Sequence, residues 1–140
     1  LKYKDLFINE TIKLHQSYEE NCNAMVDEKY IKQAVGNYIT NSIKHSEENR
    51  NVYVRVMHKD SYVRIEVENE GENIPEELSD KIWDMFYSGD TTENLQGQKG
   101  SGLGLYIVKS ITILHNGKYG FDNLENGVVF WIEIPKKLSE

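Results

Sequence analysis

Hydrophobic residues recur along this chain with two different spacings, which predict helices packed on a sheet. Between residues 28 and 46 the apolar positions fall every three or four residues, the spacing of an amphipathic helix. Residues 102–115 follow the same spacing, and Asn116-Gly117 ends that helix. Residues 4–20 also favour a helix, although their pattern is less regular. The apolar positions of the best defined helix are Ile31, Val35, Tyr38, Ile39 and Ile43.

Alternating hydrophobic and polar residues predict the strands. A hairpin is expected around a turn at 59–61, because valine and isoleucine alternate with other residues on both sides of it. Strands at about 118–123 and 128–134 follow, joined by a turn at 125–127, and residues 23–27 favour one more short strand. Helices on one face of a mixed, mostly antiparallel sheet make a two-layer α+β fold. The alternating hairpin positions are Val52, Val54, Val56, Val63, Ile65 and Val67.

Two connecting segments stand apart from these elements. Pro75, Glu76 and Glu77 suit the first turn of a short helix that ends near Phe86. Residues 88–100 read SGDTTENLQGQKG, a polar stretch with three glycines. Long loops inside a compact domain are usually functional, so this loop is expected to serve the site.

Length and charge narrow the function further. The 140 residues suffice for one domain, 1–140, and they carry 23 acidic against 16 basic side chains, a net charge of -7. This balance argues against a nucleic-acid partner and against docking on anionic lipid. It leaves local anion binding by backbone N–H groups open. Cys22 is the single cysteine, and the four histidines show no metal-ligand spacing.

The predicted helix at 28–46 has an unusual polar side. Gln33, Asn37, Asn41 and Lys44 fall together, nearly opposite the apolar stripe. A solvated face is the ordinary explanation, but asparagine is a poor helix former, and two of them one turn apart carry a cost without a local benefit. Amide oxygens can ligate Mg²⁺ and amide N–H groups can hold phosphate oxygens.

The end of the second hairpin strand contains another candidate. Asn69 shares strand parity with Val63, Ile65 and Val67, so its side chain should point into the core. An asparagine that caps its own turn is the alternative. The functional interpretation is an amide that hydrogen-bonds a planar heterocycle, with Gly71 allowing close approach of the backbone.

Alternating glycines open the helix at 102–115. Gly100-Ser101-Gly102-Leu103-Gly104-Leu105 runs directly into it. Glycines also end loops, but here three of them sit where glycine costs about 1 kcal/mol each against alanine. The backbone N–H groups and the positive dipole end at a helix N-terminus suit phosphate.

The order of these motifs resembles the catalytic, ATP-binding domain of bacterial sensor histidine kinases. It looks closest to the low-GC Gram-positive subgroup that includes the vancomycin-resistance sensors. The resemblance covers nearly the whole chain from about Val26. The segments that carry it are YIKQAVGNYITNSIKHS (N box), VENEGENIP (first glycine box), IWDMFY (F box), GSGLGLYIVKS (second glycine box) and the closing HNGKYGFDNLENGVVFWIEIP.

The resemblance implies the Bergerat α/β sandwich, ATP and Mg²⁺. By position, Asn37 resembles the Mg²⁺ ligand, Asn41 and Lys44 resemble phosphate contacts, and His45 lies near the nucleotide. Gln33 is given only a positioning role, because an amide cannot take a proton. Residues 88–100 would be the ATP lid, with Phe86 as a hydrophobic anchor at its base. The phosphates would be wrapped by Lys99, Gly100, Ser101, Gly102, Leu103, Gly104 and Leu105.

The first glycine box, which also contains Gly71 and Ile74, departs from the family pattern. Asn69 replaces the aspartate that binds the adenine amino group, and Asn73 replaces the second glycine. Asn69 still offers a carbonyl oxygen but no charge, so we expect weaker nucleotide affinity. The stretch between Tyr18 and Asp27 is also shorter than the hairpin usual in the family.

The four histidines lack the context of a phosphoacceptor. The resemblance therefore implies a domain that donates the γ-phosphoryl of Mg-ATP to a histidine on an upstream dimerisation helix of a homodimeric kinase, which then serves a response regulator. It would be the cytoplasmic part of a membrane sensor kinase, with any membrane contact through upstream segments. A nucleotide-binding pseudokinase and an anti-sigma-type serine kinase remain alternatives. Gyrase-type and chaperone-type ATPases share parts of the pattern but generally use a glutamate to activate water.

Overall fold

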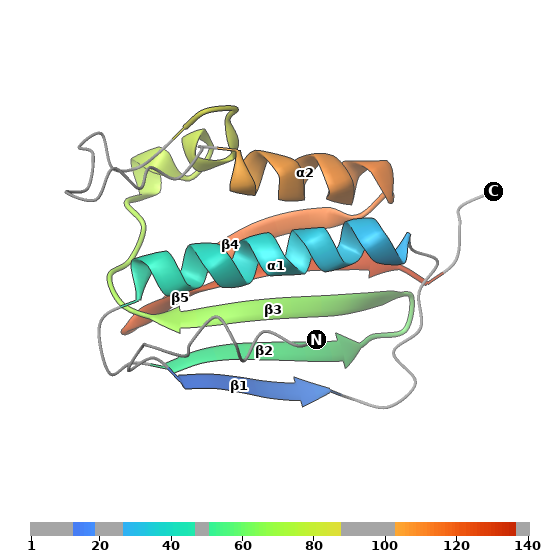
Figure 1. Cartoon of the computed structure of the whole chain (residues 1–140), viewed down its shortest axis with the longest axis horizontal. Helices are drawn as coiled ribbons and strands as arrows, with labels where there is room; N and C mark the ends of the chain where they lie inside the picture. The colour runs from blue at the N-terminus through green and yellow to red at the C-terminus, as the bar shows by residue number, and fades with distance from the viewer. Residues whose placement is uncertain (1–12, 19–26, 47–50, 88–102, 137–140) are drawn as a thin grey trace.

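The computed structural model describes residues 13–18, 27–46, 51–87 and 103–136. They form a five-stranded sheet with the strand order β1-β2-β3-β5-β4, and both α-helices lie on one side of it (Figure 1). The elements are β1 (Lys13–Tyr18), α1 (Glu28–His45), β2 (Asn51–His58), β3 (Tyr62–Glu70), the 3₁₀ turns η2 (Glu76–Leu78) and η3 (Lys81–Trp83), α2 (Gly104–Leu114), β4 (Lys118–Leu124) and β5 (Gly127–Pro135).

The sheet is mixed but mostly antiparallel. Strands β2, β3, β5 and β4 pair antiparallel, whereas β1 pairs parallel with β2, with Lys13 opposite Asn51. The prediction of a helix over 4–20 is therefore wrong for residues 13–18. Parallel pairing with a distant strand, which local sequence does not encode, decided this segment. The rest of that predicted helix and residues 23–26 lie outside the described residues.

The core lies between α1, α2 and the sheet. Strand β3 alternates as predicted, and its inward row is Val63, Ile65, Val67 and Asn69. Tyr38 of α1 is fully buried, and its hydroxyl donates to the carbonyl oxygen of Trp131 at 3.0 Å. Burial raises the pKa of Tyr38 well above its ordinary value, so this phenol stays a neutral donor.

The N-terminus of α1 is well capped. The Asp27 carboxylate accepts from the backbone N–H groups of Lys29 and Tyr30, as an N-cap aspartate should. The Asp27 N–H donates to Nε2 of His115 at 3.0 Å, while Nδ1 of His115 lies 2.8 Å from the carbonyl oxygen of Ile111. Because Nε2 accepts, the proton belongs on Nδ1, and the ring links the start of α1 to the end of α2.

On the sheet face away from the helices, close ion pairs join a cluster of charged residues, here called the open-face ion network: Arg55, Arg64, Glu66, Glu68 and Glu133. Arg64 contacts Glu66 and Glu133 at 2.7 Å each, and its guanidinium stacks over the ring of Trp131. Burial alone would raise the pKa of Glu66, but hydrogen bonds from Arg64 and Arg55 and their positive charges hold it below its ordinary value.

The segment after β3 forms shorter turns than predicted. In place of one helix from Pro75 to near Phe86, there are the two 3₁₀ turns η2 and η3, which bury Ile82 and Trp83. Short turns are enough to place these two side chains of η3 in the core, with Leu78 and Tyr87 packed partly buried against it. The predicted helices at 28–46 and 102–115 and all four later strands are confirmed within one or two residues in the described part. No helix among the described residues is long and apolar enough to cross a membrane.

Candidate functional site

The polar row predicted on α1 faces the start of α2. Gln33 and Lys44 are exposed, while Asn37 and Asn41 are half-buried. The amide nitrogen of Asn37 donates to the carbonyl oxygen of Gly104 at 3.2 Å. That contact uses the donor end of the amide, so the oxygen Oδ1 is the end left for a ligand. The structure thus joins two motifs that the sequence places 67 residues apart.

Asn41 lies one turn further along the same row. Its Nδ2 is buried and has no hydrogen-bond partner. A buried donor without a partner costs about 1–3 kcal/mol, which a fold tolerates where a ligand supplies the missing acceptor. Asn41 is therefore suited to hold an anionic oxygen beside Asn37.

A second group of unpartnered polar atoms lies deeper, at the junction of α1 and β3. Asn69 is 2% exposed, as strand parity predicts, and its Oδ1 has no partner. The hydroxyl of Ser42 is equally buried and unpartnered. Sequence reasoning missed Ser42. Its signal was a polar residue in the buried stripe of α1, three residues after Ile39.

Gly71 lies where β3 passes the end of α1. A Cβ added there would stand 2.9 Å from the carbonyl oxygen of His45 and 3.4 Å from Nδ2 of Asn69. The backbone of residue 71 therefore packs directly on the last turn of α1. Glycine is needed here for close approach to α1, whereas the sequence predicted an approach of the backbone to a ligand, which stays a prediction.

Asn73, expected in the nucleotide site, holds a turn through its side-chain amide. Its Nδ2 donates at 2.8 Å to the carbonyl oxygens of Leu124 and Gly127. Next to it, the backbone of Ile74 exchanges two hydrogen bonds with the amide of Asn123. These contacts fix the loop after β3 against the β4–β5 turn.

The N-terminus of α2 has no side-chain cap. Leu103 occupies the cap position and has no side chain that could accept a hydrogen bond, so the cap residue itself does not satisfy the first N–H groups of α2. Leu105 packs against the core and anchors the helix. Such a helix end suits a phosphate. The lid predicted at 88–100 lies outside the described residues, as do the predicted phosphate contacts Lys99, Gly100, Ser101 and Gly102.

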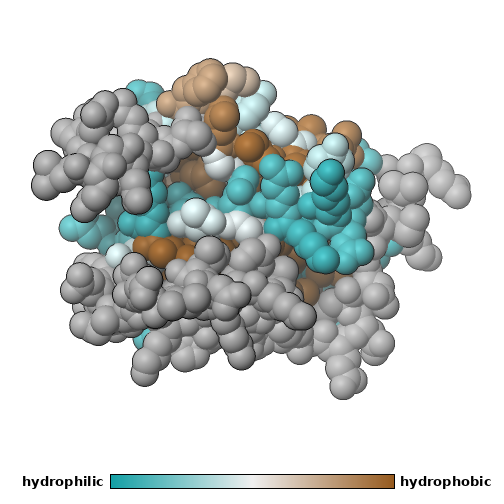
Figure 2. Space-filling view, viewed as in Figure 1, coloured by the Kyte–Doolittle hydropathy of each residue, from teal (hydrophilic) through white to brown (hydrophobic). Residues whose placement is uncertain are grey.

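Phe86 ends the segment that leads to the predicted lid. Its side chain is 70% exposed and its φ is 64°, a left-handed conformation that is unusual for a bulky residue. Among the described residues Phe86 is thus not anchored in the core, unlike Trp83. Hydrophobic residues also reach the surface along α2, whereas the outward side of α1 is hydrophilic (Figure 2). Ile113 and Leu114 are the exposed hydrophobic residues of α2.

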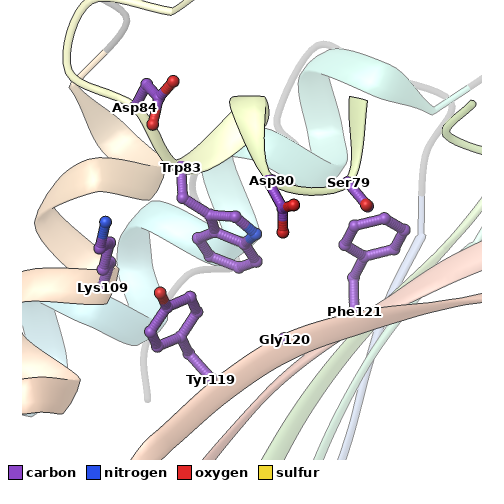
Figure 3. Close-up of a pocket in the computed structure, with 8 residues that line it drawn as sticks. All are labelled: Ser79, Asp80, Trp83, Asp84, Lys109, Tyr119, Gly120 and Phe121. Carbon is purple, nitrogen blue, oxygen red and sulfur yellow. The ribbon is translucent and has the colours of Figure 1, made fainter. Parts of the chain in front are cut away.

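A surface cavity of about 540 Å³ lies elsewhere, between η3, α2 and β4 (Figure 3). It contains none of the predicted nucleotide residues. Its lining consists of Ser79, Asp80, Trp83, Asp84, Lys109, Tyr119, Gly120 and Phe121. The rings of Trp83 and Tyr119 meet edge-on with centroids 4.7 Å apart, so much of this lining also serves the core.

A metal at this site would need amide ligands. The described residues contain no group of three or more His, Cys, Asp or Glu side chains that is placed to hold a metal ion. Mg²⁺ commonly keeps several waters and takes one or two protein oxygens plus phosphate oxygens. Oδ1 of Asn37 fits such a donor set, because its own Nδ2 is held by Gly104.

Comparisons with known proteins agree with this geometry. Residues 26–138 match the family described as histidine kinase-, DNA gyrase B-, and HSP90-like ATPase. Sensor histidine kinase CusS of Escherichia coli (strain K12) is 31% identical over 116 residues, 83% of this chain and 24% of CusS. Sensor protein VanSC of Enterococcus gallinarum is 29% identical over 118 residues, 84% of this chain and 32% of VanSC. The chain spans about a quarter of the length of the first such relatives.

Solved structures give the same result. The nucleotide-free catalytic domain of histidine kinase ThkA is 34% identical, with a TM-score of 0.83, over 96% of this chain and 85% of that one. ThkA in complex with the response regulator protein TrrA is 31% identical with a TM-score of 0.67, over 89% of this chain and 34% of that one.

Proposed function

This chain belongs to the family of histidine kinase-, DNA gyrase B-, and HSP90-like ATPases and is an ATP-binding catalytic domain of the sensor histidine kinase type. From that premise we propose that it binds Mg-ATP between α1, the end of β3 and the start of α2. We further propose that it donates the γ-phosphoryl to a histidine on a dimerisation helix of the same full-length kinase. The whole of residues 1–140 would act as one domain, with 88–100 as the lid.

One observation supports this location above the others. Nδ2 of Asn41 is buried without a partner, on the same helix side as Asn37, whose own amide is tied to Gly104 at the start of α2. An unsatisfied donor beside an uncapped helix end favours a negatively charged oxygen.

The chemistry that Mg-ATP supplies is an activated phosphoryl group whose transfer depends mostly on positioning and on compensation of negative charge. In our proposal Oδ1 of Asn37 faces the Mg²⁺, and Nδ2 of Asn41 donates to a phosphate oxygen. Lys44 adds positive charge, and the α2 N–H groups from Leu103 to Leu105 hold phosphate oxygens with residues 99–102. Gln33 is exposed and serves only to position.

Three further roles complete the proposed site. Asn69 contacts the base, Gly71 lets the backbone approach α1, and His45 borders the nucleotide. Asn73 and Ile74 support the loop after β3 through their contacts with the β4–β5 turn. Phe86 would meet the lid, because it is exposed directly before that segment.

The partners proposed for the full-length protein follow from its relatives. These are named sensor kinases, and one structural neighbour is in complex with a response regulator. We therefore propose a homodimeric sensor kinase with its own response regulator, with this chain as the cytoplasmic catalytic part of a membrane-bound protein. Nucleic acid is not among the proposed partners, since the net charge is -7.

Calorimetric titration tests the nucleotide site. We expect ADP and a non-hydrolysable ATP analogue to bind with Kd values between about micromolar and millimolar, more tightly with Mg²⁺. Asn41→Ala should weaken both by about tenfold or more, because one charge-assisted hydrogen bond is lost. Asn37→Ala should remove the effect of Mg²⁺. Thr40→Ala is the matched control, since Thr40 is exposed, adjacent to Asn41 and outside the site.

Transfer itself needs the acceptor. A separately prepared helical hairpin that carries the phosphoacceptor histidine should become labelled from γ-labelled ATP when mixed with this chain. Labelling of serine in place of histidine would favour the anti-sigma-type kinase, and tight binding without any transfer would favour a pseudokinase. Absence of saturable binding in the titration would refute the proposed site.

A further inference from the structure

Two rows of buried side chains end in polar residues at the same end of the molecule. In α1 the inward row runs through Val35 and Ile39 to Ser42, and in β3 it runs through Val67 to Asn69. Both elements run in the same direction, so their C-terminal ends lie together (Figure 1). A hydroxyl and an amide thus replace aliphatic side chains where the two rows finish.

Gly71 lies against both of the elements that carry these residues. The position of a Cβ on Gly71 is 3.4 Å from Nδ2 of Asn69 and 2.9 Å from the carbonyl oxygen of His45. Ser42 lies one turn before, and the hydroxyl of Ser46 donates to its carbonyl oxygen at 2.6 Å. The Asn69 side chain therefore faces the last turns of α1, the part of the helix that carries Ser42.

The strand around Asn69 holds it firmly. It pairs with Val52 on one side and Val128 on the other, and a Cβ on Gly127 would stand 2.2 Å from its carbonyl oxygen. The backbone is thus fixed between two strands, while the amide group can still turn about its last bond. The backbone thus holds the amide in place, while rotation of the amide group lets it present either its oxygen acceptor or its N–H donor to a ligand.

The polar atoms at the ends of these two rows have no hydrogen-bond partner among the described residues. Oδ1 of Asn69 and Oγ of Ser42 are both buried and unsatisfied. Two such atoms on elements that pack against each other are difficult to explain by folding alone, since each carries a desolvation cost. Their partner is expected to be a ligand with both donors and acceptors on one edge.

We propose that Ser42 and Asn69 read the six-position edge of a purine and that the site accepts 6-amino and 6-oxo purine nucleotides alike. This rests on the proposed nucleotide site. Adenine presents an amino donor beside a ring-nitrogen acceptor, and a 6-oxo purine presents a carbonyl acceptor beside a ring N–H donor. An amide pairs with either edge by exchanging its two ends, and a hydroxyl also donates or accepts.

The aspartate that the family resemblance places at position 69 behaves differently. A carboxylate only accepts hydrogen bonds, so it favours the amino group and opposes a carbonyl oxygen. Selectivity in such sites comes chiefly from leaving a buried polar group unpaired. Asparagine removes that penalty, and relaxed choice of base is the consequence.

The test compares ADP with inosine diphosphate, because these two differ only at the six-position edge. Calorimetric titration of this chain should give Kd values within about tenfold of each other. Asn69→Asp should bind ADP at least as well as the wild type and should weaken inosine diphosphate by about a hundredfold relative to ADP. Ser42→Ala, the matched variant without a charge change, should weaken both nucleotides by a similar factor and keep their ratio.

Each outcome has a distinct meaning. Tight ADP binding with inosine diphosphate rejected about a hundredfold by the wild type would leave the proposed function standing and overturn this inference. An unchanged ratio in a folded Asn69→Asp variant would also overturn it. If neither nucleotide binds, the proposed function fails and the inference fails with it. The wild-type ratio is decisive by itself should Asn69→Asp not fold.

Discussion

The polar side chains on the two faces of β3 differ in whether they have hydrogen-bond partners. On the open face, Arg64, Glu66 and Glu68 are paired within the ion network. On the helix face, Asn69 is more deeply buried, yet its Oδ1 has no partner among the described residues, and neither has the buried hydroxyl of Ser42 on α1. Neighbouring positions of one strand, alternating in direction, therefore belong to two different kinds of polar environment.

This difference separates folding from binding. A polar cluster whose members satisfy one another contributes to the folded state, while a buried cluster left unsatisfied lowers stability until a ligand completes it. The open face has one exception, the indole N–H of Trp131, which is buried without a partner. We therefore expect substitutions on the open face of the sheet to alter the stability of the fold, and substitutions on the helix face to alter nucleotide affinity.

The largest expected effect is on the open face. Arg64→Ala would leave Glu66 and Glu133 without a shared partner and remove the stacking on Trp131. We expect a loss of about 2–3 kcal/mol in the free energy of unfolding, less than for a fully buried pair, because Arg64 keeps 18% of its side chain exposed. Urea denaturation measures this. Nucleotide affinity should stay unchanged, and a parallel loss of affinity would contradict the separation.

A matched control for Arg64 lies in the same hairpin. Lys59 is exposed in the turn between β2 and β3, so Lys59→Ala removes a positive charge outside the network. Its stability should stay within about 0.5 kcal/mol of the wild type.

Gly71→Ala should affect both properties, because Gly71 touches both elements of the binding face. The added Cβ would stand 2.9 Å from the carbonyl oxygen of His45, and backbone cannot move aside cheaply. We expect a loss of about 1–3 kcal/mol in stability, together with weaker ADP binding as α1 shifts from Asn69. Thermal unfolding and titration measure the two effects. Unchanged affinity in a destabilised variant would show that the α1–β3 distance is unimportant for binding.

Acid should weaken the open face before the binding face. The pKa of Glu66 in the folded protein lies below the ordinary value of 4.5, so its charged form stabilises the fold above pH 4.5. That stability is lost as the pH falls below 4.5 through the folded pKa. Unfolding curves from neutral to acidic pH should show the decline, and Glu66→Gln should flatten it. An equally steep decline in Glu66→Gln would assign the acid sensitivity to other carboxyl groups.

The smallest effect has the opposite sign. Ser42→Ala removes a buried hydroxyl without a partner, so the free energy of unfolding should rise by up to about 1 kcal/mol while nucleotide binding weakens. Alanine also favours helices, and Ser110→Ala on α2 measures that gain alone, because the Ser110 hydroxyl is exposed and bonded. If Ser42→Ala lowers stability, the hydroxyl has a partner in solution.

Local pattern was enough for the parts of the fold that bury an apolar stripe. The spacing of Val35 and Ile39 predicted α1, and the alternation on β3 predicted both its bounds and the inward direction of Asn69. Residues 13–18 were misassigned because an edge strand that pairs parallel with β2 needs no regular alternation of its own. The helix predicted from Pro75 to near Phe86 was too long, because capping signals do not determine how far a helix continues; the structure has the short turns η2 and η3 there.

The site was predictable only as far as single elements reach. The polar row of α1 predicted Asn37 and Asn41, but the link from Asn37 to Gly104 depends on how the two helices pack. Asn73 contacts carbonyl groups 51 and 54 residues away, which no local rule could supply. Ser42 was overlooked because one polar residue in an apolar stripe resembles ordinary variation until its hydroxyl is found buried and unpartnered.

The position of β5 within the sheet has a consequence for how the protein is made. Although β5 ends only at Pro135, it lies between β3 and β4, and it pairs with β3 along its whole length and with β4 from Gly127 to Glu133. The ribosome synthesises the chain from its N-terminus, so β4 is made before β5, its neighbour among the described strands. Until β5 is made, β3 also has one edge without a paired strand. The sheet of the described residues is therefore complete only after β5 has been synthesised and has paired with β3 and β4. We expect folding of this domain during translation to finish late and in one step.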